Sequence, residues 1–507
     1  MSAPPARARL AALWLVPAVA LWYASHRPCL ELGFVGDDFQ WWQHARMAIE
    51  QPSLLLAPHG GYRPLNTWTM TLDHLLYGTA PRGYHLTSLL WHLGCGLVLW
   101  AFLGRLGLSA VARGMAVAIW LCSPYTLEPA QVVSERYEPA LLAAWMALAM
   151  LWPRPGEMWR RGRVVSAVLL GALTAVMKES WVVLPAFTVL LDLVVSRTGA
   201  RAALRRGVLV ALAPVAYMAV YFARPPIAPD TYFGSILNGA IKVPHAWAVF
   251  SGLTPLRPME FNLGRPEIAA VVVAAALAYL AWRWRSVAIA VGFGFFLLPF
   301  VPVLPVSWMT SRYTFMPLAG FLTIAAATAE QCVQRLGPGY RRAAAAAFLG
   351  LGTLMLATAV AEMPGEMNDA RAFSRVHERL VDEAGAFAPR YPGGSAVVAV
   401  RLESTNPLRE ISRAPEGVAK VFFVRPEDPA GLAEWSALLS YALDPLGGPL
   451  LTTVEPDAAA GIPFAVVGYA EGGFVELPRQ AATVDAELAA WRAGGRSPRV
   501  LVPWPRR

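Results

Sequence analysis

The stretch LTSLLWHLGCGLVLWAFL, residues 86–103, carries no charged side chain. A helix of about 20 apolar residues crosses the hydrocarbon core of a bilayer and satisfies its own backbone hydrogen bonds there. Apolar segments of this kind recur at about residues 10–24, 86–103, 111–124, 138–152, 164–177, 180–195, 207–223, 267–281, 286–304, 313–330 and 343–361. Residues 1–361 are therefore predicted to form an all-α polytopic membrane domain with about 11 transmembrane helices.

The composition agrees with a membrane protein and argues against nucleic-acid binding. Of the 507 residues, 56% are hydrophobic and 15% are charged, whereas soluble domains carry about 25% charged residues. Most arginines behind the net charge of +9 occupy short loops between apolar segments, as membrane topology predicts.

The N-terminus is basic and then apolar like a signal peptide, but many spans follow it, so we expect a retained first helix. The four cysteines form no CxxC pair, which argues against a metal site or a disulfide scaffold.

The arginines also predict an orientation. Basic residues gather at alternate ends of successive segments, at Arg7, Arg9, Arg105, Arg113, Arg154, Arg160, Arg161, Arg163, Arg197, Arg201, Arg205, Arg206, Arg283, Arg285, Arg335, Arg341 and Arg342. The positive-inside rule assigns this side to the cytoplasm. The N-terminus is then cytoplasmic, while the outer loop 25–85 and residues 362–507 are extracytoplasmic. We expect the membrane to be a bacterial inner membrane.

The composition changes after residue 361, where Gly, Pro and charged residues become more frequent. The stretches SAVVAVRLE, VAKVFFV and PFAVVGYAEGGFVEL are rich in β-branched and aromatic residues and are predicted to be strands. The apolar residues of PAGLAEWSALLSYAL and VDAELAAWRA recur at helical spacing, so these two stretches are predicted to be helices. Residues 362–507 are predicted to form a small extracytoplasmic soluble domain of α/β or α+β class, whose role the sequence does not reveal.

Two adjacent carboxylates follow the first apolar segment, in FVGDDFQWW (34–42). One interpretation is structural: Asp37 caps a helix, Asp38 and Gln40 lie in its first turn, and the tryptophans anchor it flat at the bilayer surface. The other is that Asp37 and Asp38 are catalytic. The two interpretations are compatible, because a capping carboxylate can also face a cavity.

Several cationic side chains occur at the extracytoplasmic ends of apolar segments: Arg63 in YRPL, Arg136 in SERYE, Lys178 in MKES and Arg312 in SRY. Charges at membrane depth are costly and tend to mark function. Lys178 and Glu179 interrupt a long apolar run, which favours a functional cation that faces an internal cavity. The alternative interpretation is a helical hairpin whose tip reaches water, which solvates both side chains. Each arginine is alternatively an interfacial anchor. Further candidates for a shared cavity are His59, Tyr62, Glu135, Glu179 and Tyr313. No histidine pair has HExxH spacing, so a zinc site is not expected.

These features resemble integral-membrane glycosyltransferases of the GT-C class. The closer resemblance is to the O-mannosyltransferases with tetratricopeptide repeats, a dolichyl-phosphate-mannose-protein mannosyltransferase-like family, and to their bacterial relatives. It covers about residues 10–330 and rests on YRPL followed by GYHLTSLLWH, on SERYEPALLAA, on MKESWVVLP and on TSRYTFMPLAG. The chain departs from the family in carrying no tetratricopeptide repeats and in the form of the SERYE segment.

The resemblance implies an inverting transferase that moves a hexosyl or pentosyl group from a polyprenyl-phosphate donor to a lipid, glycan or protein acceptor. Transfer would take place on the extracytoplasmic face, among membrane lipids. Cations suit a phosphate leaving group, so Arg63, Arg136, Lys178 and Arg312 would bind the donor phosphate. Asp37, with Asp38 beside it, would be the general base. No cofactor is certain, and a divalent cation (Mg²⁺ or Mn²⁺) held by Asp37 is an open alternative.

Two other functions fit parts of the pattern. A transporter or flippase of lipid-linked or sugar substrates would use the same intramembrane charges, but it predicts inverted repeats that the sequence does not display. A scaffold that presents residues 362–507 would leave Lys178, Glu179 and the Asp pair without a role.

Overall fold

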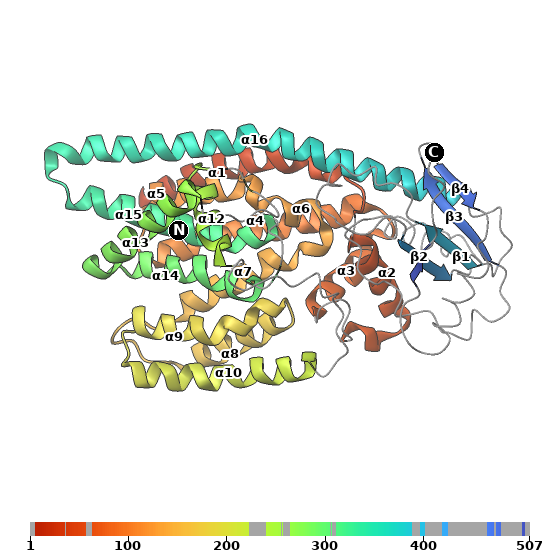
Figure 1. The fold of residues 1–507 in the computed structure, drawn as a ribbon. Helices are drawn as coiled ribbons and strands as arrows, with labels where there is room; N and C mark the ends of the chain where they lie inside the picture. Colours follow the sequence, from red (N-terminus) through yellow and green to blue (C-terminus); the bar gives the residue numbers. More distant parts are fainter. Residues whose placement is uncertain are drawn as a thin grey trace. The chain divides into compact units, whose positions relative to one another are not determined.

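The computed structural model describes the backbone of residues 6–35, 37–56, 63–222, 240–254, 256, 264–304, 306, 311–387, 396–400, 418–423, 464–470, 473–477 and 499–501. The chain divides into two compact units, and Figure 1 shows their elements. Unit 1 comprises Met1–Glu31 and Ser53–Asn368, and unit 2 comprises Leu32–Pro52 and Asp369–Arg507. Among the described residues, unit 1 is built from helices, and all five strands belong to unit 2.

Each apolar segment expected from the sequence coincides with a helix. The longer helices of unit 1 are α1 (Ala6–His26), α3 (Pro64–Tyr77), α4 (Pro81–Arg105), α5 (Ala110–Leu121), α7 (Tyr137–Leu151), α8 (Arg161–Ala175), α9 (Leu184–Val194), α10 (Ala200–Phe222), α12 (Lys242–Phe250), α13 (Arg265–Trp284), α14 (Val287–Leu297), α15 (Ser311–Arg335) and the first part of α16 (Pro338–Phe387). The short elements are η1 (Arg27–Glu31), η2 (Pro52–Leu55), η3 (Pro124–Thr126), α6 (Glu128–Gln131), η4 (Val133–Glu135), η5 (Glu179–Val183) and η7 (Leu298–Val303), of which η2 begins in unit 2.

Within the part of the chain that the structure describes, four helices are long and apolar enough to cross a membrane: α4, α13, α15 and Pro338–Ala372 of α16. Three shorter apolar helical segments accompany them, Ala110–Leu121, Ser180–Val194 and Val287–Val303. Only 17% of the apolar window of α13 and 11% of that of α16 is buried within the protein. These helices leave apolar side chains for lipid, and the chain is an integral membrane protein. The predicted total number of spans stays a prediction.

Unit 1 has an aromatic core that joins four of its helices. Phe295 of α14 packs edge-on against Phe102 of α4 and Phe187 of α9, with ring centroids 5.2 and 5.1 Å apart, and Trp145 of α7 stacks on Phe187 at 4.9 Å. A Cβ on Gly320 of α15 would meet the α14 backbone, so glycine permits this close approach. Such packing matters in a bilayer, where lipid removes most of the hydrophobic drive for helix association.

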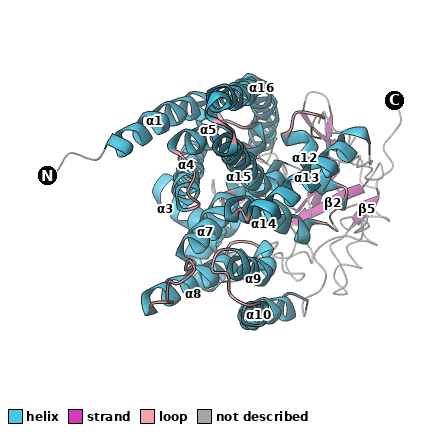
Figure 2. Ribbon diagram, turned by 90° about the vertical axis from the view of Figure 1, so that its left-hand side faces the viewer, coloured by secondary structure: helices cyan, strands magenta, loops and turns pink. Residues whose placement is uncertain are grey.

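Unit 2 contains α2 (Asp37–Glu50), the last part of α16 and a five-stranded sheet of order β4-β3-β1-β2-β5, drawn in magenta in Figure 2. The strands are β1 (Ala396–Val400), β2 (Val418–Phe423), β3 (Phe464–Ala470), β4 (Gly473–Leu477) and β5 (Arg499–Leu501). β1 and β3 are parallel, and the other pairs are antiparallel. In the register, Val398 pairs with Val421 of β2 and with Val466 of β3.

The three stretches predicted as strands after residue 361 are strands in the structure, the third forming both β3 and β4. The two predicted helices after residue 425 lie outside the described residues. The α/β or α+β class of residues 362–507 therefore stays a prediction.

Candidate active site

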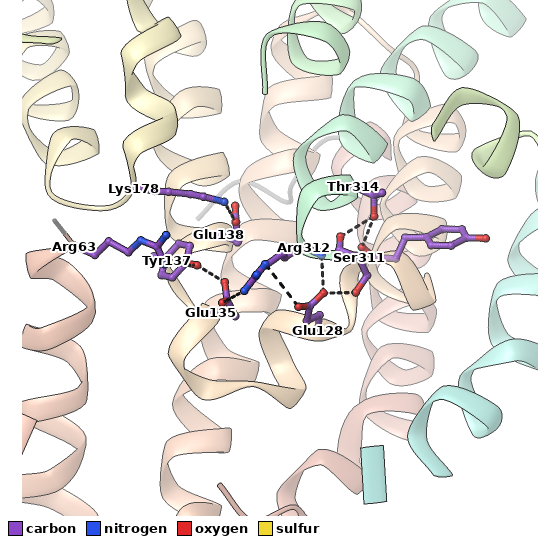
Figure 3. A network of polar contacts seen from close by, with 10 residues as sticks. Arg63, Glu128, Glu135, Tyr137, Glu138, Lys178, Ser311, Arg312 and Thr314 are labelled. Atoms are coloured by element: carbon purple, nitrogen blue, oxygen red, sulfur yellow. Dashed lines mark hydrogen bonds and ion pairs between the residues drawn. The ribbon is translucent and has the colours of Figure 1, made fainter. Parts of the chain in front are cut away.

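Four segments of unit 1 that are distant in sequence converge on one polar network, which Figure 3 shows. They are the start of α3, the connection between α5 and α7, the residue before η5 and the first turn of α15. Two hydrogen bonds hold the first three together. The amide of Leu65 donates to the carbonyl of Val176 at 2.9 Å, and the Asn66 side chain donates to the carbonyl of Ser134 at 2.9 Å. Residues 63, 134–138 and 178 are thereby brought close to one another.

Glu128 attaches the start of α15 to the α5–α7 connection. Its Oε2 accepts hydrogen bonds from Ser311 Oγ at 2.6 Å and from the Arg312 backbone amide at 2.7 Å. A carboxylate at a helix N-terminus satisfies free amides and opposes the positive end of the helix dipole. The Arg312 side chain then reaches back to Glu135, with Nη1 2.5 Å from Oε1, and lies 4.0 Å from Glu128.

Tyr137 connects Arg63 to the same carboxylate. Arg63 Nη1 donates to the Tyr137 hydroxyl at 2.7 Å, and that hydroxyl donates to Glu135. The Arg63 guanidinium also lies over the Tyr137 ring, 4.5 Å from its centroid. Tyr137 is 1% exposed, so both contacts are shielded from water, which strengthens them.

Lys178 completes the network between two tyrosine rings. Its ammonium forms an ion pair with Glu138 and lies 5.4 Å from the Tyr137 ring centroid and 5.5 Å from that of Tyr313. Lys178 is only 7% exposed, which contradicts the alternative that water solvates it at a hairpin tip. Three cations and three carboxylates thus alternate across the site, and Figure 3 shows how they face one another.

The electrostatics keep Glu135 ionised. Burial raises the pKa of Glu135, but the charges of Arg312, Arg63 and Lys178 and the Tyr137 hydrogen bond outweigh it, and the pKa falls below its ordinary value. A carboxylate at this depth is stable only because cations surround it. The cations in turn hold fixed positions that a phosphate group could share.

Arg136 points to other partners, although the sequence grouped it with the donor-binding cations. It is 1% exposed, forms an ion pair with Asp73 of α3, and donates to the carbonyls of Val133 at 2.9 Å and Tyr84 at 3.2 Å. Thr87 Oγ1 also donates to Asp73 at 2.7 Å. Arg136 therefore ties α3 to α4 and the connection before α7, and its expected contact with the donor phosphate stays a prediction. Burial raises the pKa of Asp73, an effect that the charge of Arg136 opposes.

The structure brings together five of the residues that the sequence put forward: Arg63, Lys178, Arg312, Glu135 and Tyr313. His59 and Tyr62 lie outside the described residues, and so does the side chain of Glu179. Their predicted places in the site stay predictions.

Asp37 and Asp38 begin α2, in unit 2. The Asp37 side chain lies outside the described part of the chain, so its role as the base stays a prediction. Asp38 is buried, and its Oδ2 accepts from the Val35 amide at 3.1 Å while its own amide donates to the Val35 carbonyl. Asp38 therefore lies in the first turn of α2, as expected, and holds the residue before the helix, whereas capping by Asp37 stays a prediction. Trp41 and Trp42 are also buried, which contradicts the expectation that they anchor a helix flat on the bilayer surface.

Sequence reasoning missed three members of the network: Glu128, Tyr137 and Glu138. Glu138 carried a usable signal, because it is a charge at the beginning of an apolar helix and follows Arg136 by two residues. Glu128 and Tyr137 carried none, since only the fold brings the α5–α7 connection to α15 and α3.

Within the described residues, no group of three or more His, Cys, Asp and Glu side chains is placed to hold a metal ion. The network carboxylates do not fit one either, because Glu138 faces Lys178 and both Glu135 and Glu128 face Arg312. The divalent cation considered at Asp37 stays a prediction, because the Asp37 side chain lies outside the described residues.

Comparisons with known proteins add little to this description. No protein-family profile and no curated protein matches the chain. Two solved structures resemble it: ArnT from Cupriavidus metallidurans bound to undecaprenyl phosphate, and the same protein in the apo state. The first is 14% identical with a TM-score of 0.46 and covers 96% of this chain and 97% of that one; the second is 15% identical with a TM-score of 0.47 and covers 96% of both. Because both TM-scores lie below 0.5, these similarities assign the chain to no family.

Asp73→Asn tests the structural role of Arg136. The substitution leaves a buried guanidinium without its counter-ion, which costs about 3–5 kcal/mol in comparable cases. Thermal unfolding in detergent should show a marked loss of stability. Glu157→Gln is the matched control, because it removes an exposed partner of Arg163 and should leave unfolding unchanged. Wild-type stability in Asp73→Asn would mean that Arg136 does not depend on this pair.

Proposed function

We propose that the protein is an integral-membrane glycosyltransferase of the GT-C class that uses a polyprenyl-phosphate-linked sugar. Arg63, Lys178 and Arg312 bind the donor phosphate, and the sugar passes to a lipid, glycan or protein acceptor on the extracytoplasmic face. Arg136, a fourth candidate from the sequence, is left out of this proposal because it is 1% exposed and also donates to two backbone carbonyls.

One observation carries the proposal: three cations from three separate segments meet in a single network at the ends of membrane helices. Placing buried charges there is costly, and such charges usually serve a substrate. Guanidinium groups match the oxygens of a phosphate in a fixed fork, and a lysine adds a mobile point charge. A polyprenyl tail would explain why this site is embedded in lipid.

In the proposed reaction, the acceptor hydroxyl attacks the anomeric carbon of the donor sugar. The bond between that carbon and the phosphate oxygen breaks, and its electron pair leaves with polyprenyl phosphate. The acceptor's proton passes to a carboxylate, which we assign to Asp37, and the configuration inverts. Arg63, Lys178 and Arg312 stabilise the charge that grows on the leaving phosphate, so this departure needs no general acid.

Arg312→Lys tests the phosphate assignment while keeping the charge. Lysine loses the planar fork that reaches Glu135 and a phosphate together. Transfer from a radiolabelled polyprenyl-phosphate sugar by purified protein should fall about 100-fold or more, the usual effect of losing one such donor. Arg341→Lys, at an exposed position on α16, is the matched control and should retain activity.

Asp37→Asn in the same assay should abolish transfer and leave donor binding intact, whereas Asp369→Asn on the exposed face of α16 should not affect transfer. Full transfer by Asp37→Asn would contradict the base assignment. Donor binding without transfer in the wild-type protein, together with movement of the lipid between leaflets, would favour the transporter or flippase instead.

The orientation is the second part of the proposal. The arginine distribution places the N-terminus in the cytoplasm and residues 362–507 outside it, in a bacterial inner membrane. A periplasm-active reporter fused after residue 370 should therefore be active, and one fused after Arg160 should not. A cytoplasmic signal at 370 would contradict the proposed side of the reaction.

A further inference from the structure

The proposed phosphate site is already electrically balanced before a phosphate arrives. Lys178 pairs with Glu138, Arg312 pairs with Glu135, and Arg63 reaches Glu135 through the Tyr137 hydroxyl. A site evolved simply to hold an anion tightly would leave its cations without carboxylate partners. The carboxylates in this network therefore need an explanation of their own.

Burial makes these carboxylates strong competitors for an anion. Glu135 and Glu138 are each 2% exposed, and Lys178 is 7% exposed, so little water or salt screens their attraction. Glu128 differs from them because it is 19% exposed at its side chain and its Oε2 fixes the backbone of α15. Its role is to position a helix.

Glu138 is the carboxylate best placed to exchange with a phosphate. Glu135 is held on two sides, by the Tyr137 hydroxyl and by Arg312, and moving it would disturb the whole network. Glu138 is held by Lys178, whose ammonium sits on a flexible stem and can rotate its donors to a new partner. The rings of Tyr137 and Tyr313 also lie near that ammonium, so part of its surroundings does not depend on Glu138.

We infer that Glu138 is an internal counter-ion that competes with the lipid phosphate for Lys178. This inference rests on the proposed function. Glu138 releases Lys178 when the donor binds and takes it back when the product leaves.

The chemistry of the reaction gives this competition a purpose. The donor is a phosphate diester with about one negative charge, whereas the released polyprenyl phosphate is a monoester with about 1.5 to 2. The three cations would bind that product more tightly than the donor, and slow product release limits many enzymes. A carboxylate that reclaims Lys178 offsets the extra affinity and allows turnover to continue.

Glu138→Gln separates competition from a purely structural role. The change keeps the shape of the side chain and removes the competing charge. Undecaprenyl phosphate should bind the variant about tenfold more tightly or better, because one neighbouring charge shifts such equilibria by a factor of ten or more. Two quantities are measured in detergent: the dissociation constant of undecaprenyl phosphate and the rise in unfolding temperature when it is added. Because the temperature rise compares each variant with and without the lipid, a lower basal stability of Glu138→Gln does not affect the comparison.

Three comparisons make the experiment decisive. Glu157→Gln, an exposed carboxylate paired with Arg163, should bind undecaprenyl phosphate like the wild type. Lys178→Met should bind it far more weakly. Inorganic phosphate, tested alongside, shows whether the headgroup alone responds to Glu138→Gln in the same direction.

Equal or weaker binding of undecaprenyl phosphate by Glu138→Gln, with normal binding by the wild type, would overturn the counter-ion role and leave the proposed function standing. No binding by the wild type would instead overturn the proposed function itself. In a transfer assay, Glu138→Gln should also turn over more slowly at saturating donor and be more strongly inhibited by added undecaprenyl phosphate.

Discussion

The mutual neutralisation of buried charges is the constraint on which the rest of the site depends. Glu135 sits 2% exposed at the ends of membrane helices, where an unpaired carboxylate would be costly. Arg312 from α15 and, through the Tyr137 hydroxyl, Arg63 from the start of α3 compensate it. Satisfying this one group fixes the relative positions of segments that lie more than 170 residues apart in the chain. The phosphate site that we propose relies on the same contacts.

The local structure of the α5–α7 connection explains how so many charges occupy a small space. The chain passes through η3, α6 and η4 before α7 begins, and these short turns change direction every few residues. Glu128 thereby faces the start of α15, Arg136 turns toward Asp73 of α3, and Glu138 faces Lys178. A continuous helix through residues 124–138 would spread these side chains around its circumference. The short elements η3, α6 and η4 instead bring these side chains close together. Arg136 can then hold α3 and α4 while Glu138, two residues later, contacts Lys178.

The sequence was sufficient to predict the helices and several site members, and insufficient to predict their partners. Spanning length and the absence of charge are local properties, so each expected apolar segment coincides with a helix. Lys178 and Arg312 stood out because a charge beside an apolar run is unusual. Arg136 looked equivalent to them, and its pairing with Asp73, 63 residues away, is visible only in the fold. The roles of Glu128 and Tyr137 likewise depend on contacts with α15 and Arg63 that no local pattern encodes.

We have proposed that Arg63, Lys178 and Arg312 form one phosphate site. The most direct test is an electron cryomicroscopy map of the protein with polyprenyl phosphate bound. We expect density for the phosphate within hydrogen-bonding distance of Lys178 Nζ and the Arg312 guanidinium, with Arg63 facing the same group. Phosphate density elsewhere, with the Lys178–Glu138 and Arg312–Glu135 pairs intact, would contradict it.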